Sequence, residues 1–162
     1  MTNTCLITGG SGGLARALAA LLRAEGWQLA RAGRRHDGLR PDEGDLLIEA
    51  DVSTEAGALL AVAEASTRFG APPTAVVNAA GALLLAPLTR TSEAQYRECL
   101  AANLDTAFFT AKAYVGALQQ AQKAGGSGAG RLLLFSSVAA GIGVGNHAAI
   151  AMAKGAIEAL VR

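Results

Sequence analysis

The segment Thr8-Gly9-Gly10-Ser11-Gly12-Gly13-Leu14-Ala15 follows the apolar run Cys5-Leu6-Ile7 and precedes an alanine- and leucine-rich helical pattern that extends to Leu22. Glycines at such a bend let the backbone turn tightly and approach a ligand closely. The helix that follows presents unpaired N–H groups and its positive dipole end to an anion such as a pyrophosphate. The segment therefore predicts a strand, a turn and a helix that bind a dinucleotide. The expected contact residues are Gly9, Ser11, Gly13 and Leu14.

Two spacings within this segment fit a dinucleotide site. Gly10-x-Gly12-x-x-Ala15 matches the dinucleotide fingerprint with an alanine at its last position. Thr8-Gly9-x-x-x-Gly13-x-Ala15 matches a longer-spaced variant. The alternative is a flexible glycine loop without a ligand, and the flanking strand and helix patterns argue against it.

Composition limits the function classes. A chain of 162 residues with 51% hydrophobic residues can bury one core, so we expect a single domain over residues 1–162. Its 14 basic and 13 acidic residues nearly balance, which argues against a nucleic-acid partner. Cys5 and Cys99 do not form a disulfide framework and indicate buried thiols in a reducing compartment. Neither a leader nor a membrane-spanning apolar run is predicted, so the expected location is the cytoplasm, and no metal site is expected.

Short apolar runs alternate with longer helical patterns along the chain. This alternation predicts an α/β fold, a Rossmann-like doubly wound parallel sheet with helices on both faces. Strands are expected at about 3–8, 27–32, 45–50, 74–78 and 131–136. Helices are expected at about 13–25, 54–68, 92–122 and 147–162, with Asn146 as the cap of the last one. The glycine-rich segment 125–130 is predicted to be a flexible connector without function.

Further motifs follow these expected strands in a fixed order. They are Asp51-Val52 after the third strand, Asn78-Ala79-Ala80-Gly81 after the fourth, Asn103 in the long helix, Ser136-Ser137 at the end of the fifth strand, and Lys154 in the last helix. Together with the glycine segment, they resemble the short-chain dehydrogenase/reductase family, which comprises nicotinamide-dependent oxidoreductases with a Rossmann fold. The resemblance covers the chain from Met1 to Arg162.

The resemblance implies a role for each of these residues. Asp51 and Val52 would hold the adenine, and Asn78, Ala79 and Gly81 would line the cofactor groove. Ser137 would orient a substrate carbonyl or alcohol. Lys154 would hold the nicotinamide ribose and lower the pKa of a tyrosine, with support from Asn103 through a water. The implied catalytic residues are therefore Asn103, Ser137 and Lys154.

Taken singly, these residues have structural interpretations as well. A serine at a strand end often bonds local backbone, which applies to Ser137. Asn103 could be a satisfied buried amide, and Asp51 a turn former. Lys154 alone would be a solvated helix lysine. Their order along the chain is what favours the functional interpretation.

The chain departs from the family pattern at the proton donor. Similar sequences carry Tyr-x-x-x-Lys, whereas this chain reads Ile150-Ala151-Met152-Ala153-Lys154. An isoleucine cannot protonate a carbonyl oxygen, a role typically worth ~10² to 10⁴ in rate. His147 lies about one turn earlier and is the nearby residue that titrates near neutral pH, although an exposed first-turn histidine is the simpler interpretation.

A second departure is length. The family usually continues through two further strands and a substrate lid, whereas this sequence ends at Arg162 within an apolar helical pattern. We therefore expect a sheet that lacks its last strands, either in a truncated chain or with the exposed side covered by another chain. The identity of the substrate is not readable from these residues.

The end of the second strand predicts the cofactor. About 20 residues past the glycine turn, where an acidic residue would bind the 2′-hydroxyl of NAD, the sequence reads Ala32-Gly33-Arg34-Arg35. A guanidinium can bind a 2′-phosphate with forked hydrogen bonds, so Arg34 favours NADP over NAD. The alternative is a solvated surface cluster, which we expect for most of the basic residues in this segment: Arg31, Arg34, Arg35, His36 and Arg40.

These features give one leading functional hypothesis and two alternatives. The leading one is an NADP-dependent oxidoreductase of a small carbonyl or alcohol, with impaired or altered proton transfer. The alternatives are a catalytically inactive nucleotide-binding or scaffold homologue, and a fragment without activity. Ala148, Met152, Ala156 and Leu160 recur at four-residue spacing in the last helix, which favours a homodimer or homotetramer.

Overall fold

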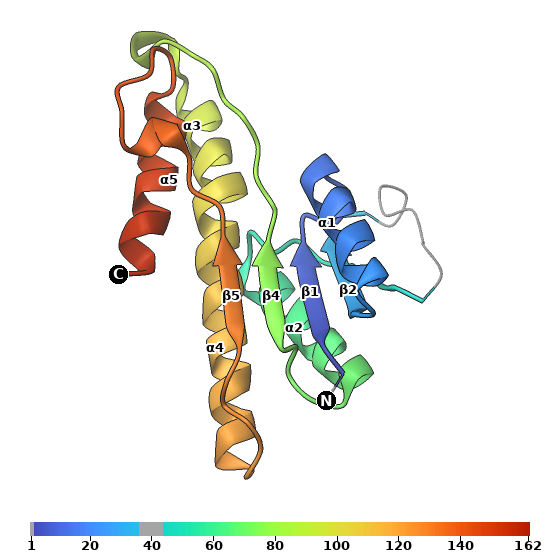
Figure 1. Cartoon of the computed structure of the whole chain (residues 1–162). Helices are drawn as coiled ribbons and strands as arrows, with labels where there is room; N and C mark the ends of the chain where they lie inside the picture. The colour runs from blue at the N-terminus through green and yellow to red at the C-terminus, as the bar shows by residue number, and fades with distance from the viewer. Residues whose placement is uncertain (1, 36–43) are drawn as a thin grey trace.

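The computed structural model describes residues 2–35 and 44–162. Within these residues, five strands form one sheet in the order β3-β2-β1-β4-β5, and all neighbours are parallel (Figure 1). The strands are β1 (Thr4–Thr8), β2 (Gln28–Gly33), β3 (Leu46–Glu49), β4 (Ala75–Asn78) and β5 (Arg131–Leu134). The predicted Rossmann-like sheet is confirmed, and each strand begins and ends within two residues of its expected bounds. The strand order reverses between β1 and β4, which is where such sheets bind ligands.

Helices cover both faces of the sheet because the strand residues alternate between two apolar clusters. Cys5 and Ile7 of β1 pack with α1 (Gly13–Ala24) on one face. Leu6, between them, belongs to the cluster on the opposite face, which also contains residues of α2 (Glu55–Phe69) and α4 (Thr106–Lys123). β1 is buried along its whole length, as expected for the central strand of a sheet covered on both faces.

Local signals explain the bounds of α1 and α2. The chain reverses after α1 at Gly26, whose φ of 77° is left-handed. Thr54 caps α2, since its hydroxyl accepts a hydrogen bond from the N–H of Gly57 at 3.1 Å. Gly70, with a φ of 74°, terminates the same helix. Both helices therefore begin and end within one residue of the bounds expected from the sequence.

The long helical region contains a π turn. The α3 helix (Glu93–Leu100) begins with a capping box between Ser92 and Gln95, and α4 begins at Thr106. Between them, η3 (Ala101–Asp105) is one π-helical turn, a form found often at functional sites. The helical region expected over about 92–122 is thus present from Glu93 to Lys123, and the π turn around Asn103 is the part that was not predicted.

The last helix, α5 (Ala148–Leu160), packs against α3, η3 and α4. Its N-cap is His147, and the preceding Asn146 has a φ of 63°. The prediction of Asn146 as the cap is wrong by one residue, because Asn146 is the residue that takes the left-handed bend before the helix starts.

The glycine connector before β5 has a packing role that the sequence did not indicate. A Cβ on Gly130 would overlap the hydroxyl of Tyr114, which donates a hydrogen bond to the carbonyl of Pro73 at 2.6 Å. Gly130 is therefore required where β5 starts, although the rest of segment 125–130 is exposed.

Two short 3-10 turns, η2 (Leu88–Arg90) and η4 (Val138–Ala140), lie in the loops after β4 and β5. In the described part of the chain, no helix combines the length and apolar character needed to cross a bilayer.

Candidate nucleotide and catalytic site

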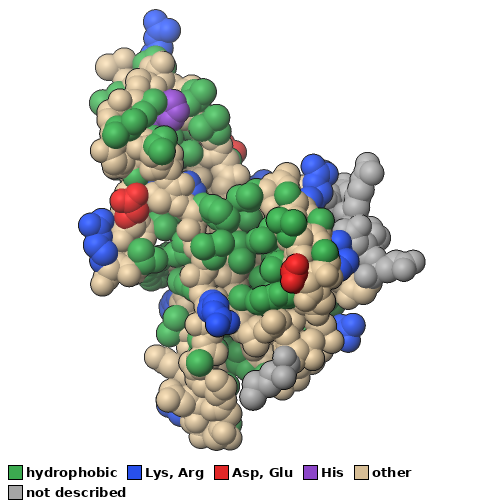
Figure 2. Space-filling model, in the orientation of Figure 1, with side chains coloured by type: hydrophobic (Ala, Val, Ile, Leu, Met, Phe, Trp, Pro, Cys, Tyr) green, Lys and Arg blue, Asp and Glu red, His purple; other side chains and the backbone are tan. Residues whose placement is uncertain are grey.

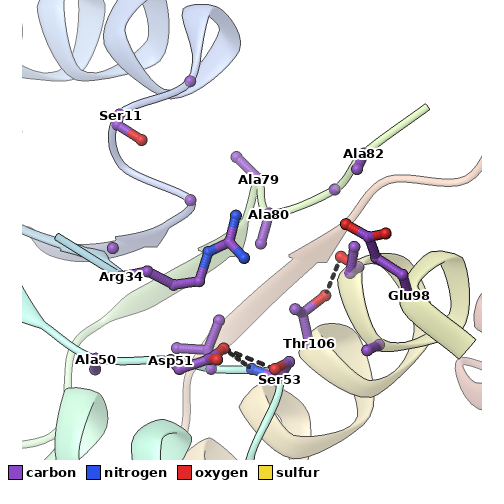
Figure 3. Close-up of a pocket in the computed structure, with 17 residues that line it drawn as sticks. Ser11, Arg34, Ala50, Asp51, Ser53, Ala79, Ala80, Ala82, Glu98 and Thr106 are labelled. Carbon is purple, nitrogen blue, oxygen red and sulfur yellow. Dashed lines mark hydrogen bonds between the residues drawn. The ribbon is translucent and has the colours of Figure 1, made fainter. Parts of the chain in front are cut away.

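A groove of about 260 Å³ opens where the carboxyl ends of β1, β2, β3 and β4 meet (Figure 3). This volume lies just below the usual range of small-molecule pockets, ~300 to 1,000 Å³, so the groove would hold part of a dinucleotide. The described residues that line it are Gly9, Ser11, Gly12, Gly33, Arg34, Ala50, Asp51, Val52, Ser53, Ala79, Ala80, Gly81, Ala82, Glu98, Ala101, Ala102 and Thr106.

The glycine loop forms one wall, and its shape requires glycine. Gly9 has a φ of 67°, and a Cβ there would lie 2.5 to 2.7 Å from backbone atoms of Ala79 and Ala80. The loop is also held by hydrogen bonds from Gly10 N–H to the Ala32 carbonyl and from Gly12 N–H to the Gly9 carbonyl, both 2.9 Å long. A glycine cradle at the start of a helix fits a pyrophosphate.

Two predicted loop residues lie outside this wall. Gly13 is the first residue of α1, and Leu14 is 53% exposed, but neither lines the groove as the structure describes it. Gly9 and Ser11 do line it.

Asp51, Val52 and Ser53 form the wall at the end of β3. The Asp51 Oδ1 atom accepts hydrogen bonds from the Ser53 N–H at 3.0 Å and from the Ser53 hydroxyl at 2.7 Å (Figure 3). Asp51 is thus a turn former that also lines the groove, so both interpretations of this residue apply. Gly57 packs so closely on the Asp51 carbonyl that a Cβ there would overlap it, which fixes the turn against α2.

Arg34 lies in the groove and Arg31 does not. The Arg34 side chain extends from the end of β2 toward Ala79 and Ala80 (Figure 3). Arg31 is 1% exposed and pairs with Asp45, so its assignment to a solvated surface cluster is wrong. Arg31 lies within β2, which is paired on both sides, and the carboxylate of Asp45 compensates its buried charge. Arg35 is exposed, as expected, whereas His36 and Arg40 lie outside the described residues.

Asn78 supports the groove from below. It is 3% exposed; its Oδ1 accepts a hydrogen bond from the Thr8 hydroxyl, and its Nδ2 donates to Thr106 Oγ1 at 3.4 Å. The neighbouring Ala79 and Gly81 line the groove directly.

Thr106 and Glu98 also line the groove, from α4 and α3, and neither was predicted from the sequence. Thr106 stands three residues after Asn103, on the same side of the helical region, and this spacing could have indicated it. Glu98 carries no motif; its carboxylate lies across the groove from Arg34 (Figure 3).

Beside the groove, Asn103 and Lys154 converge on Gly81. A Cβ at Gly81 would lie 3.0 Å from Asn103 Oδ1 and 3.9 Å from Lys154 Nζ. The Asn103 Nδ2 atom donates to the carbonyls of Ala82 at 2.8 Å and Cys99 at 3.0 Å. These contacts explain the π turn, because the amide competes for a carbonyl that a regular helix would use.

Lys154 is a buried cation, 9% exposed. Its Nζ donates to the Phe135 carbonyl at 2.9 Å. Burial lowers the pKa of Lys154 below its usual value, and the charge that Cys99 carries when deprotonated partly opposes this effect. The interpretation of Lys154 as a solvated helix lysine is therefore excluded.

Ser137 and Ile150 lie at the same end of the sheet. The Ser137 hydroxyl oxygen accepts a hydrogen bond from the Ala139 N–H at 3.2 Å, a local capping contact. The neighbouring Ser136 instead bonds α5, through Glu158 Oε1 at 2.5 Å. Ile150 is 8% exposed and packs in an apolar cluster with Cys99, Ala149, Leu84 and Tyr96.

The possible proton donors near Ile150 are limited. His147 is partly exposed, with its Nδ1 atom 2.6 Å from the Gly145 carbonyl. Tyr114 uses its hydroxyl in the core, on Pro73. Tyr96 packs against the cluster that contains Ile150, so it lies nearer to this position than Tyr114 does.

Comparison with known proteins shows which proteins this chain is similar to. A family model described as enoyl-(acyl carrier protein) reductase matches residues 9–162. The 3-oxoacyl-[acyl-carrier-protein] reductase MabA of Mycobacterium tuberculosis H37Rv is 28% identical over 162 residues, which is 100% of this chain and 62% of MabA. MabA of Mycobacterium avium is 29% identical, over 100% of this chain and 60% of its own. The chain therefore spans about three fifths of the length of these relatives.

Solved structures give the same result for the fold. Levodione reductase superposes with a TM-score of 0.85 at 28% identity, covering 99% of this chain and 64% of its own. An NAD⁺-bound xylitol dehydrogenase superposes with a TM-score of 0.84 at 25% identity, covering 98% of this chain and 62% of its own.

We predict that Gly9→Ala destabilises the protein whereas Gly13→Ala does not. The first substitution combines a left-handed φ with backbone overlap, so it should lower the free energy of unfolding by about 1 to 3 kcal/mol. The second places a methyl group where no described atom lies within 4 Å, at the start of a helix that favours alanine. Thermal denaturation followed by circular dichroism measures both. Equal melting temperatures for the two variants would contradict the steric role of Gly9.

Proposed function

Because this chain belongs to the short-chain dehydrogenase/reductase family, we propose that it binds NADP and transfers hydride between the nicotinamide and a small carbonyl or alcohol, with proton transfer impaired at Ile150. The observation that carries the proposal is the juxtaposition of two features at one end of the sheet. One is a glycine-walled groove that contains Arg34. The other is the convergence of Asn103 and Lys154 on Gly81, in the wall of that groove.

Under this proposal, different described residues would hold different parts of the cofactor. Gly9 and Ser11 would hold the pyrophosphate, Asp51 and Val52 the adenine, and Lys154 the nicotinamide ribose. Arg34 would bind the 2′-phosphate, since its guanidinium reaches into the groove from the end of β2, where a carboxylate would favour NAD. When bound, the nicotinamide supplies or accepts the hydride.

We predict that the chain binds NADP⁺ more tightly than NAD⁺ and that Arg34→Asp reverses this order. The substitution removes the partner of the 2′-phosphate and introduces a carboxylate that repels it, while a carboxylate can accept a hydrogen bond from the 2′-hydroxyl of NAD⁺. We expect NADP⁺ affinity to fall by at least tenfold, about the effect of one lost charge-assisted hydrogen bond. Isothermal titration with both cofactors measures the two dissociation constants.

The matched control is Arg162→Asp, which makes the same change of charge at an exposed residue at the end of the sequence. It should leave the ratio of the two constants unchanged. Equal or tighter NAD⁺ binding by the unmodified chain would overturn the NADP assignment.

Proton transfer is the step at which this chain departs from its family. The Ser137 hydroxyl would orient the substrate oxygen, and the Lys154 ammonium would hold positive charge nearby. Ile150 occupies the tyrosine position, four residues before Lys154 and thirteen after Ser137, and it has no proton to give. Reduction would then proceed slowly, supported by proximity and by Ser137 alone.

We predict that Ile150→Tyr raises the rate of carbonyl reduction by up to ~10² to 10⁴, the contribution typical of a general acid. The relatives' names suggest 3-oxoacyl thioesters among the test carbonyls. Loss of NADPH absorbance gives the rate. Ile150→Phe is the matched control, since it adds the ring without the hydroxyl and should leave the rate low. Because the chain covers about three fifths of its relatives, the assay also includes any longer form that its gene encodes.

Three outcomes would change this interpretation. If the unmodified chain reduces carbonyls rapidly and His147→Ala abolishes the activity, His147 is the donor. If rapid turnover survives both substitutions, the reacting site lies elsewhere. If NADPH binds but Ile150→Tyr remains inactive in every form, the chain acts as a nucleotide-binding homologue without catalysis.

We further propose that copies of the chain associate through α5. Its outward side presents Met152, 57% exposed, and Leu160, 39% exposed, in line with the smaller Ala148 and Ala156. We predict a dimer or tetramer by sedimentation velocity at micromolar concentration, and a shift toward monomer in Met152→Glu because a carboxylate would be buried in the contact. A stable monomer of the unmodified chain would contradict the association.

A further inference from the structure

A buried charge cluster lies beneath the glycine loop, on the α1 side of the sheet. Arg31 of β2 is 1% exposed, and its Nε lies 2.9 Å from Oδ2 of Asp45, whose side chain is 3% exposed. The same oxygen accepts a hydrogen bond from Nη2 of Arg23 at 2.8 Å. One carboxylate thus joins α1, β2 and the residue before β3.

Arg31 also contacts the glycine loop directly. Its Nη1 donates a hydrogen bond to the Gly10 carbonyl at 3.4 Å, and the N–H of Gly10 donates to the Ala32 carbonyl at 2.9 Å. Both polar groups of Gly10 are therefore bound by β2. On the other side of the loop, Gly9 packs closely against the backbone of Ala79 and Ala80.

The contact fixes the orientation of one peptide plane. In a trans peptide, the carbonyl of Gly10 and the N–H of Ser11 point in opposite directions. Because the carbonyl points down to Arg31, the Ser11 N–H points to the other side of the loop. Ser11 is the residue of that peptide that lines the groove.

We propose that Arg31 is a positioning residue of the cofactor site: held by Asp45, it turns the Gly10–Ser11 peptide so that its N–H faces the bound pyrophosphate. The inference rests on the proposed function. A guanidinium suits this role because different nitrogens of the same group contact the carboxylate and the carbonyl. The ammonium of a lysine is a single compact group, so it cannot make both contacts in the same geometry. Burying a charge costs desolvation free energy. An apolar side chain at position 31 would avoid that cost, as Leu29 does two positions earlier on the same face.

The test compares two ligands that differ in the pyrophosphate. NADP⁺ carries it, whereas adenosine 2′-monophosphate carries the adenine and the 2′-phosphate without it. We expect Arg31→Lys, which keeps the charge beside Asp45, to weaken NADP⁺ binding about tenfold while adenosine 2′-monophosphate binds as before. The exposed Arg68 of α2 provides the matched control, and Arg68→Lys should change neither dissociation constant.

A second variant guards against misfolding. Arg31→Met combined with Asp45→Leu replaces the buried pair by apolar side chains, an exchange that proteins often tolerate. It should show the same selective loss of NADP⁺ affinity, because the Gly10 carbonyl again lacks its donor.

The outcomes separate this inference from the proposed function. Equal weakening of both ligands in the two Arg31 variants would show a merely structural role and overturn the inference, as would unchanged NADP⁺ binding. An unmodified chain that binds neither ligand would overturn the proposed function and this inference with it.

Discussion

The close approach of two backbone segments, Gly9 against Ala79 and Ala80, is the constraint on which the groove depends. β1 and β4 pair in parallel, so the loops that leave them emerge side by side at the same edge of the sheet. With no Cβ on Gly9, these loops touch, and the start of α1 and the segment after β4 become two adjacent walls. A side chain at Gly9 would push the two walls apart by about the width of a methyl group. The groove between them would then have a different shape.

A second set of contacts attaches the helical region 93–123 and α5 to this frame. Asn103 bonds the carbonyl of Ala82, which follows the β4 segment, and Lys154 bonds the carbonyl of Phe135, which follows β5. The two side chains thus connect the π turn and α5 to successive strand ends. The groups that the proposed reaction would use therefore also hold these elements together.

Much of the architecture could be predicted from the sequence because its signals are local. Apolar runs, caps such as Thr54 and left-handed glycines such as Gly70 act within a few residues. The features that were missed depend on partners distant in the chain. Asn103 lies in a π turn, and its side chain donates a hydrogen bond to the carbonyl of Ala82, 21 residues earlier. Arg31 is buried where Asp45 and the Gly10 carbonyl bind its guanidinium, and Glu98 of α3 lines the groove formed by the strand ends. The glycine motif correctly predicted that Gly9 and Ser11 line the groove. It also predicted Gly13 and Leu14, which lie outside it, because the spacing of a motif does not give the direction of each residue.

The packing of Ile150 against Cys99, Leu84 and Tyr96 has a consequence for solvent. Enzymes that carry their own proton donor can expel water from the reacting centre and gain from the low dielectric that remains. Under the proposed function, a site with isoleucine at this position must take its proton from the solvent, so every reduction would need a water molecule to enter. Exclusion of water from the site would favour hydride transfer but would oppose the proton transfer that completes the reduction. The hydration of the space around Ile150 would then determine the rate of reduction.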